Sequence, residues 1–223
     1  MKASKNSPVP SLLDYPRPSV AVDTAVLTVA DGALRVLLVR RGEEHHRGEW
    51  ALPGTFLRER ERLADAVLRC LREKAGISGR VPRQLHVFDD PERDDRGWVL
   101  SVAHVDVVPL AELEDALKSD GVRLASVSGE PELTAELPYG HAEIVAKAVG
   151  WLRAVYAEAP DPGALLDEPF TLKDLRDLHE VVAGTSLMRD TFRRFMEPQL
   201  AGTGQMSDGT RGRPSRLWRR ARQ

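Results

Sequence analysis

The sequence predicts an α/β domain followed by a smaller domain built from two helices and a hairpin. Residues 19–40 have the pattern of a strand hairpin, and apolar residues recur at helical spacing over 62–75 and 141–156. The breaker Ala159-Pro160-Asp161-Pro162-Gly163 ends this pattern, and a different one follows. We therefore expect a flexible leader over residues 1–18, a first domain over 19–158, a linker over 159–165 and a second domain over 166–223.

The composition is typical of a soluble globular protein. Of the 223 residues, 42% are apolar and 30% are charged. No apolar run approaches the roughly 18 residues of a transmembrane helix, and the N-terminus lacks the apolar core of a signal peptide. Because Cys70 is the single cysteine, no internal disulfide can form, and we expect a cytoplasmic protein with no membrane partner.

Charge is distributed unevenly along the chain. The formal net charge is −2, yet residues 188–223 hold nine arginines and only three acids. This segment therefore carries +6 and the remainder of the chain carries −8. A basic tail on an acidic body indicates either a module that binds a polyanion or a solvated, charge-rich terminus.

The first predicted elements form a hairpin. Residues 1–18 contain four prolines and no periodic apolar pattern, so we expect a loose leader. Ser19–Ala30 is rich in Val, Thr and Ala and predicts a strand, and Ala33–Arg40 is the return strand. Asp31-Gly32 between them favours a type I′ turn.

The segment after the hairpin is polar and contains His45 and His46. Two adjacent histidines do not easily face one point, and no third ligand lies nearby in the sequence. We therefore expect a solvated loop here and no metal site.

A helix is predicted over 62–75, because apolar residues repeat at three and four positions, and Gly76 is placed to end it. Cys70 lies on the apolar stripe, so we expect a small buried side chain rather than a reactive thiol. Strands are predicted over 85–88, 98–108 and 122–127, with a charged loop over 89–97 and a short helix over 110–117. An amphipathic helix over 141–156 completes the first domain.

The pattern after the breaker is that of a different domain. Thr171 is placed to cap a helix that runs to about Val182. A second helix is predicted over 187–196, with a core-facing stripe of Met188, Phe192, Phe195 and Met196. A glycine-rich segment over 202–212 and a strand over 215–220 follow. Two helices joined by a short turn and followed by a hairpin are the outline of a winged helix-turn-helix.

The loop and helix over Trp50–Ile77 resemble the Nudix box. The box of that family reads G-x5-E-x7-R-E-U-x-E-E-x-G-U, where U is apolar, and it grips a magnesium-bound diphosphate. With Gly76 and Ile77 aligned, the frame is kept at Glu61, Arg69 and Glu73.

Two metal-ligand positions of the box are replaced, because Cys70 and Lys74 stand where the family has glutamates. Thr55 stands at the first glycine, directly after Gly54. Mg²⁺ requires several oxygen ligands, and Glu73 beside an ammonium is a poor site for it. We therefore expect a vestigial box without catalytic residues, no required cofactor and no bound Mg²⁺. Lys74 either offsets phosphate charge in place of the metal or is a solvated helix residue.

The two halves together resemble the Nudix-related transcriptional regulators over about residues 16–220. The segments that carry the resemblance are PRPSVAVDTAVLTV, VLLVRRGEEHHRGEWALPGTFLR, DPERDDRG, HAEI, FTLKDLRDLHEVVAG and RGRPSRLWR. The resemblance implies a Nudix α/β/α sandwich with a mixed sheet, followed by a small winged helix-turn-helix domain. It also implies a homodimeric repressor that binds double-stranded operator DNA, senses ADP-ribose or a related nucleotide and controls genes of NAD or sugar metabolism. The alternative is an active Nudix hydrolase of ADP-ribose or another nucleoside diphosphate derivative with an appended basic module.

The candidate ligand-binding residues are mainly basic or aromatic. Arg93 and Arg96 either hold a diphosphate or pair with neighbouring acids, and the same alternatives apply to Arg40, Arg41 and Arg58. Trp50 and Phe56 either stack on an adenine or are buried in the core. The box residues Glu73 and Lys74 complete this set.

The candidate DNA-binding residues lie on the second helix and on the wing. Arg189 and Arg193 are four positions apart, so they share a helix face that can enter a major groove. Arg194 is placed to reach phosphate, and Thr191 belongs to the same helix. On the wing, the residues placed to contact the DNA backbone or minor groove are Arg211, Arg213 and Arg216.

Overall fold

The computed structural model describes residues 11–42, 44–127, 137–208 and 214–221. Within these residues, the strands and α-helices of the first domain are β1 (Ser19–Ala30), β2 (Ala33–Arg40), β3 (Trp50–Ala51), β4 (Gly54–Phe56), α1 (Leu63–Ala75), β5 (Arg83–Phe88), β6 (Val99–Val107), β7 (Val122–Ser126) and α3 (His141–Glu158). The predicted hairpin strands, the box helix and the long helix from His141 are confirmed. The short helix predicted over 110–117 is instead two 3-10 helices, Leu110–Leu113 and Ala116–Lys118. The leader predicted over 1–18 lies outside the described residues as far as residue 10, and Leu12–Asp14 forms a 3-10 helix.

The strands of the first domain form one mixed sheet. Its order is β3-β2-β1-β6-β5, with β4 added beside β1 and β7 beside β2. The long central pair β1 and β6 is parallel, whereas β1 pairs with β2 in antiparallel register. At the hairpin turn, Asp31 and Gly32 have φ of 52° and 68°. These left-handed values agree with the predicted type I′ turn.

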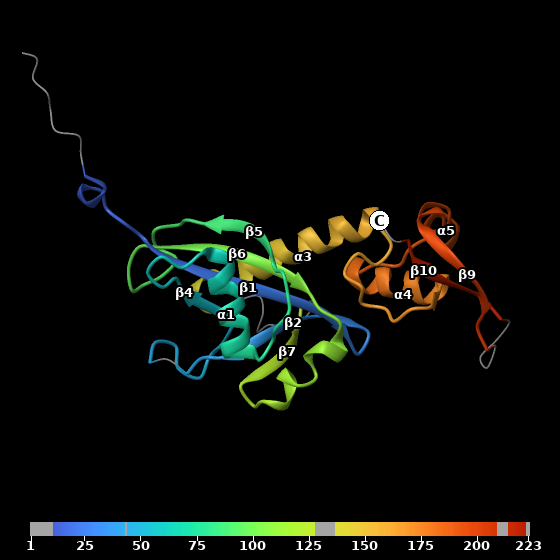
Figure 1. The fold of residues 1–223 in the computed structure, drawn as a ribbon, viewed down its shortest axis with the longest axis horizontal. Coiled ribbons are helices and arrows are strands. Elements are labelled where there is room, and N and C mark those ends of the chain that lie inside the picture. The colour runs from blue at the N-terminus through green and yellow to red at the C-terminus, as the bar shows by residue number, and fades with distance from the viewer. Residues whose placement is uncertain (1–10, 43, 128–136, 209–213, 222–223) are drawn as a thin grey trace, which may run out of the picture.

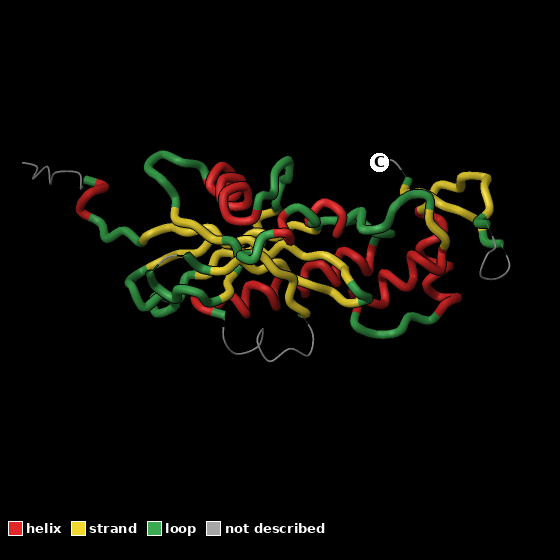
Figure 2. The backbone as a smooth tube through the Cα atoms, turned by 90° about the horizontal axis from the view of Figure 1, so that it is seen from below, coloured by secondary structure: helices red, strands yellow, loops and turns green. Residues whose placement is uncertain are grey.

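Helices cover both faces of this sheet. Successive residues of a strand point to opposite faces. Val22 and Val26 of β1 pack with α1 in one buried cluster, whereas Ala25 and Leu27 pack with α3 in another. Figure 2 shows helices on both sides of the strands, and the predicted α/β/α sandwich with a mixed sheet is confirmed.

The second domain contains β8 (Phe170–Thr171), α4 (Leu172–Ala183), α5 (Arg189–Met196), β9 (Leu200–Met206) and β10 (Arg216–Arg220). The three strands form a sheet of order β8-β10-β9. Thr171 caps α4 as predicted: its hydroxyl accepts from the backbone N–H of Asp174, and the Asp174 carboxylate accepts from the backbone N–H of Thr171. Two helices and a hairpin therefore form the predicted winged helix-turn-helix.

Of the four residues predicted to face the core from the second helix of this domain, only two are buried. Phe192 and Met196 are buried, but Met188 is 79% exposed and Phe195 is 48% exposed. Met188 precedes α5, with an extended ψ of 116°, so it does not continue the helical periodicity. Met188 and Phe195 instead line an apolar pocket between α3, α4 and α5. The prediction of four core-facing residues was wrong for these two.

The two domains share part of one core. Leu178 and Val182 of α4 belong to the same buried cluster as α3 and the sheet of the first domain. Arg153 of α3 also donates to the carbonyl oxygen of Val182 at 3.1 Å. Figure 1 shows α3 running from the sheet to α4. The winged helix is thus packed against the helix that covers one face of the sheet.

Asp161, in the segment between the domains, is fully buried and highly bonded. Its carboxylate accepts from the Tyr156 hydroxyl at 2.8 Å and from Arg220 of β10 at 2.6 Å. It also accepts from two backbone amides of its own loop, and its own N–H donates to Nε2 of His179 on α4 at 3.2 Å. This residue therefore joins α3, α4 and β10.

Within the described residues, no helix has the length and apolar character needed to cross a membrane.

Candidate functional site

A cationic pocket lies on the first domain beside β1, β4 and α1. Five of the predicted ligand-binding residues line it together, namely Arg41, Phe56, Lys74, Arg93 and Arg96. They come from four separate segments of the chain, which the fold brings together beside the central strand β1. Asp23, Tyr139 and His141 are among the lining residues that were not predicted.

Arg93 is buried at the wall of this pocket, with a side chain only 8% exposed. It donates to the carbonyl oxygen of Tyr139 at 2.7 Å, and its guanidinium lies 3.8 Å from the Asp23 carboxylate. The guanidinium of Arg96 donates two hydrogen bonds to the Asp94 carboxylate, of 2.9 and 2.7 Å. Both arginines therefore pair with acids, which was one of the two alternatives drawn from the sequence, and both also line the pocket. The other alternative, that they hold a diphosphate, stays a prediction.

Tyr139 lies between the arginines of the pocket. The guanidinium of Arg41 is 4.9 Å from its ring centroid, and that of Arg96 is 4.8 Å away. Arg96 also lies 5.2 Å from the ring of Phe56. Such stacking holds planar cations in a fixed orientation.

A buried polar network supports the floor of the pocket. Asp23 accepts from the Ser101 hydroxyl at 2.5 Å and lies 3.3 Å from Nε2 of His141. Burial alone would raise the pKa of Asp23, but His141, Ser101 and Arg93 together hold it at about 2. Because Nδ1 of His141 accepts from the backbone N–H of Leu52, the ring proton is on Nε2 and points at Asp23.

Gly54 allows this network to form. A Cβ at position 54 would lie 1.9 Å from Oδ1 of Asp23. No side chain fits there, which explains why the chain keeps a glycine one position before Thr55. Because it has no side chain, Gly54 lets β4 pair closely with β1, where Gly54 lies opposite Asp23.

The other four predicted ligand-binding residues do not line the pocket. Arg40 donates to the carbonyl oxygen of Gly48 at 3.2 Å, and Trp50 packs against the core with Arg123 over its ring. Arg58 lies 3.7 Å from Glu73, which also lies 3.6 Å from Arg69. These side chains support neighbouring elements beside the pocket.

The box carboxylates are engaged by arginines. Arg69 donates to both oxygens of Glu61, at 2.7 and 2.8 Å, and these hydrogen bonds lower the pKa of Glu61 to about 2. Cys70 is buried, which raises the pKa of its thiol to about 12 and keeps it neutral. Lys74 lines the pocket.

The box residues do not fit Mg²⁺, the metal that a Nudix box implies. Of the three clustered ligand positions, only Glu73 offers a carboxylate, and it already lies near two guanidinium groups. A neutral thiol and an ammonium occupy the other two positions. Mg²⁺ prefers octahedral oxygen coordination, which this set cannot supply.

A second charged groove lies on the winged helix. Arg189, Arg193 and Arg216 line it together. Arg189 and Arg193 thus share a face, as predicted, and Arg216 of the wing strand lies in the same groove. Lys173 and Arg176 of α4 add to it and were missed, although their spacing of three is a helix-face signal. Arg194 lines an adjoining hollow. Thr191 instead lines the apolar pocket on the other side of α5, and Arg211 and Arg213 lie outside the described residues.

One helix connects the two sites. His141, the first residue of α3, contacts Asp23 beneath the cationic pocket. Tyr156, near the other end, donates to Asp161, which binds Arg220 of the wing sheet. An α-helix of 18 residues is about 27 Å long. The pocket and the winged helix are therefore joined through a single rigid element.

Comparison with known domains agrees with this architecture. A model of the NUDIX domain matches residues 18–145, and a model of the NrtR DNA-binding winged helix domain matches residues 162–220. Over 217 residues the chain is 30% identical to the ADPR responsive transcriptional repressor NtrR of Acinetobacter baylyi. That match covers 94% of this chain and 85% of the relative.

Two solved structures are similar to the chain. The first is Shewanella oneidensis NrtR complexed with a 27mer DNA, with a TM-score of 0.78 and 30% identity over 91% of this chain and 93% of that chain. The second is the NUDIX domain of the same regulator complexed with ADP ribose, with a TM-score of 0.54 and 26% identity. It covers 64% of this chain and 93% of that chain.

Proposed function

The chain belongs to the NUDIX proteins that carry an NrtR-type DNA-binding winged helix, and we propose that it is an ADP-ribose-responsive transcriptional repressor. The observation that carries the proposal is the pocket in which Arg41, Lys74, Arg93 and Arg96 meet. Four cationic side chains at one point suit a diphosphate, because guanidinium groups bind phosphate oxygens through paired hydrogen bonds. The ADP ribose complex of the similar Shewanella oneidensis domain supports this choice of effector.

The sensor domain acts as a receptor and not as a hydrolase. Cleavage of a nucleoside diphosphate requires a metal ion that neutralises the diphosphate and activates water. The neutral thiol of Cys70 and the ammonium of Lys74 stand at two of the three ligand positions, so we propose that the box holds no Mg²⁺ and that no other cofactor is needed. A receptor that leaves its ligand intact reports the concentration of that ligand.

The winged helix binds operator DNA through the groove that contains Arg189, Arg193 and Arg216. The similar regulator solved with a 27mer DNA supports this role. We propose that two copies of the chain act together, since regulators with a helix-turn-helix commonly read two half-sites with a two-fold symmetric dimer. Sedimentation or light scattering of the free protein measures this directly.

The effector signal passes along α3 to Asp161. Ligand phosphates in the pocket compete with Asp23 and Asp94 for Arg93 and Arg96. Asp23 is in turn bonded to His141 at the start of α3, so a change in this network moves the helix whose far end binds Asp161. We propose that this shift changes the position of the winged helix and releases the operator.

The test is a gel shift of the purified full chain on its own upstream DNA. ADP-ribose at rising concentration, with Mg²⁺ present, releases the DNA, and AMP at the same concentration serves as the matched control ligand. Chromatography of the same samples recovers ADP-ribose uncut. Retention of the complex at every ADP-ribose concentration refutes the proposed effector, and turnover at an enzyme-like rate refutes the receptor role.

A further inference from the structure

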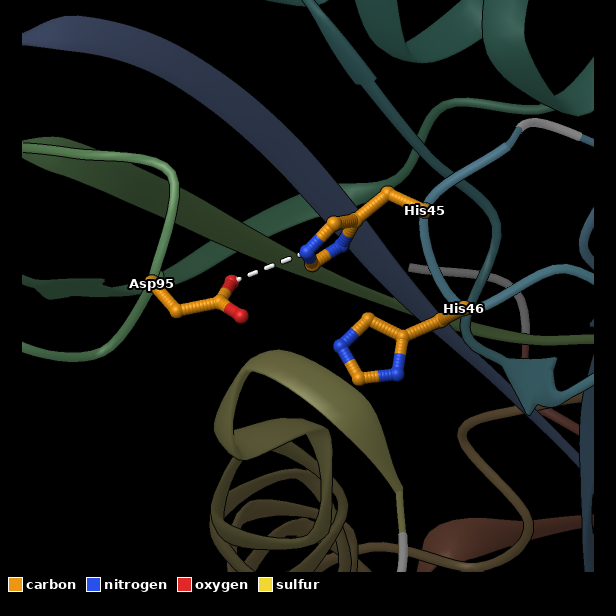
Figure 3. Close-up of side chains that lie close together, drawn as sticks. All are labelled: His45, His46 and Asp95. Atoms are coloured by element: carbon orange, nitrogen blue, oxygen red, sulfur yellow. Dashed lines mark ion pairs between the residues drawn. The ribbon is translucent and has the colours of Figure 1, made fainter.

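Three side chains form a cluster next to Tyr139, a residue that lines the cationic pocket. His45 and His46 belong to the loop between β2 and β3, and Asp95 belongs to the loop between β5 and β6. One ligand atom from each residue lies within 4.8 Å of the other two. Figure 3 shows both imidazole rings turned toward the Asp95 carboxylate. The third ligand absent from the neighbouring sequence is thus supplied by a distant loop.

We propose that His45, His46 and Asp95 form a binding site for a divalent transition metal of the zinc type. Nε2 of His45 and Oδ1 of Asp95 are 3.2 Å apart. Two ligands of a tetrahedral zinc ion are separated by about the same distance, because the bonds from zinc to nitrogen or oxygen are about 2 Å long. The pair therefore already has the spacing that a shared ion requires, and His46 needs a small loop movement to complete the set.

Each imidazole is oriented by a second polar group, as is usual for histidines that bind a metal in proteins. Nδ1 of His46 lies 2.9 Å from Oε2 of Glu49, and Nδ1 of His45 lies 2.7 Å from the hydroxyl of Tyr139. A histidine that binds a metal through one ring nitrogen almost always has the other nitrogen held by a carboxylate, a carbonyl or another polar group. The carboxylate of Glu49 favours the tautomer in which Nδ1 of His46 is protonated and Nε2 offers its lone pair.

Backbone conformation at the cluster is unusual. His46 has a φ of 56° and Tyr139 has a φ of 60°, both in the left-handed region that L side chains rarely adopt. A residue held in this region is strained, and such residues cluster at functional sites. The two strained residues here are a ligand and the residue that orients the other ligand.

The ligand set selects the class of metal. Two imidazole nitrogens and one carboxylate oxygen suit zinc and other divalent transition metals, with a fourth position left for water. Mg²⁺ and Ca²⁺ prefer oxygen ligands throughout, so they are poor occupants. This site is separate from the box, whose ligand positions lie on α1.

An ion at this site would stiffen the wall of the pocket. It would fix His45, and His45 holds the hydroxyl of Tyr139, which lies against Arg41 and Arg96. This consequence rests on the proposed function, whereas metal binding does not. A zinc titration without nucleotide therefore separates failure of the metal site from failure of the proposed function.

The experiment is calorimetric titration of ZnCl₂ into the untagged full chain after removal of metals with a chelator. We expect one zinc ion per chain and no heat from MgCl₂. The Glu49→Gln variant weakens zinc binding about 10- to 100-fold, as is usual for a lost orienting group. His46→Ala and Asp95→Ala weaken it at least as much, because they remove ligands.

His86→Ala is the matched control, since His86 is an exposed histidine on β5 outside the cluster. Its zinc affinity stays at the parent value. A circular dichroism spectrum of each variant verifies the fold. Cobalt bound in place of zinc gives the visible bands of a tetrahedral site in the parent chain and in His86→Ala, but not in His46→Ala or Asp95→Ala. Absence of zinc binding overturns the proposal, as does parent-level affinity in both His46→Ala and Asp95→Ala.

Discussion

The carboxylate of Asp161 accepts a 2.6 Å hydrogen bond from the guanidinium of Arg220, although Asp161 lies between the domains and Arg220 on the last strand of the winged helix. Asp161 is fully buried and Arg220 is largely covered. This pair places the segment that the sequence suggested as a linker at the centre of the contact between the domains. Removal of the Asp161–Arg220 ion pair is expected to lower the stability of the fold and to weaken the coupling between the two domains.

Asp161→Asn tests this role with a side chain that tolerates the left-handed φ of 47° at this position. Breaking a buried ion pair by removing one charge commonly costs about 3 to 5 kcal/mol. Thermal unfolding of the variant should show a loss of this order. The control is Asp177→Asn on the exposed pair with Lys173, where a loss of at most about 1 kcal/mol is expected. Equal losses in the two variants would contradict the assigned role.

His179 makes the stability of the chain depend on pH. Burial lowers the pKa of His179 to about 4, from an ordinary value of 6.5. Because the folded pKa is the lower one, the unfolded chain binds more protons between these values, and stability is complete above pH 6.5 and is lost as pH falls toward 4. The expected contribution lost by pH 5 is roughly 2 kcal/mol.

The His179→Gln variant isolates this contribution, since Gln keeps a polar group but does not titrate. The difference in unfolding free energy between the parent and the variant should shrink by roughly 2 kcal/mol from pH 7 to pH 5. Denaturant titrations at the two pH values measure it. A difference that stays constant would mean that His179 does not carry the dependence.

Gly54→Ala is expected to damage the sensor pocket. The new Cβ would lie 1.9 Å from the Asp23 carboxylate, so β4 or Asp23 must move. Overpacking of this kind costs about 1 to 3 kcal/mol. Both the unfolding temperature and the affinity for ADP-ribose should fall. Gly42→Ala is the matched control, because a Cβ there meets no atom within 4 Å; the same losses in that variant would refute the steric explanation.

The arginines of α5 are expected to affect DNA binding and no other property of the chain. Arg193 and Arg194 are exposed, and replacing both with Ala should cost about 2 to 6 kcal/mol of operator affinity. Nucleotide affinity and unfolding temperature should stay unchanged. Fluorescence anisotropy with labelled operator measures the loss, with exposed Arg60→Ala of the first domain as control. Operator affinity at the parent level in the double variant would remove α5 from the interface.

Restoring the box tests whether it is a retired active site. Cys70→Glu with Lys74→Glu supplies the two missing carboxylates beside Glu73. With Mg²⁺, this variant should release AMP from ADP-ribose, whereas the parent should not. Cys70→Ser with Lys74→Gln removes the thiol and the ammonium without adding carboxylates, so it serves as the control. No hydrolysis by the glutamate variant, if it remains folded, would place the loss of catalysis elsewhere.

Local sequence patterns predicted most of the helices, strands and turns, because interactions between residues close in the sequence determine where these elements begin and end. Asp31-Gly32 favours one turn, Gly76 ends α1 with a φ of 66°, and Thr171 caps α4. Met188 and the 3-10 helices after Leu110 departed from prediction, since both follow from packing rather than from periodicity. The order of elements after residue 163 already outlined the winged helix, whereas the sandwich was implied by the resemblance to a known family.

The candidate site was predicted only in part, because its contacts join distant segments. Asp23 and Ser101 are 78 positions apart, and His45 and Tyr139 are 94 apart. Arginines were recognised by charge, but neither the buried Asp23–His141 network nor the third member of the histidine cluster has a local signature. A single acid inside the apolar strand β1 is the one signal that points to Asp23.

We expect one nucleotide in the cationic pocket to govern the winged helix through α3. The most direct test of this coupling measures the dissociation constant of the operator with and without saturating ADP-ribose, and that of ADP-ribose with and without saturating operator. Thermodynamic linkage requires the same factor in both directions, and we expect about 5- to 150-fold weakening. Dissociation constants that do not change in either direction would contradict the account.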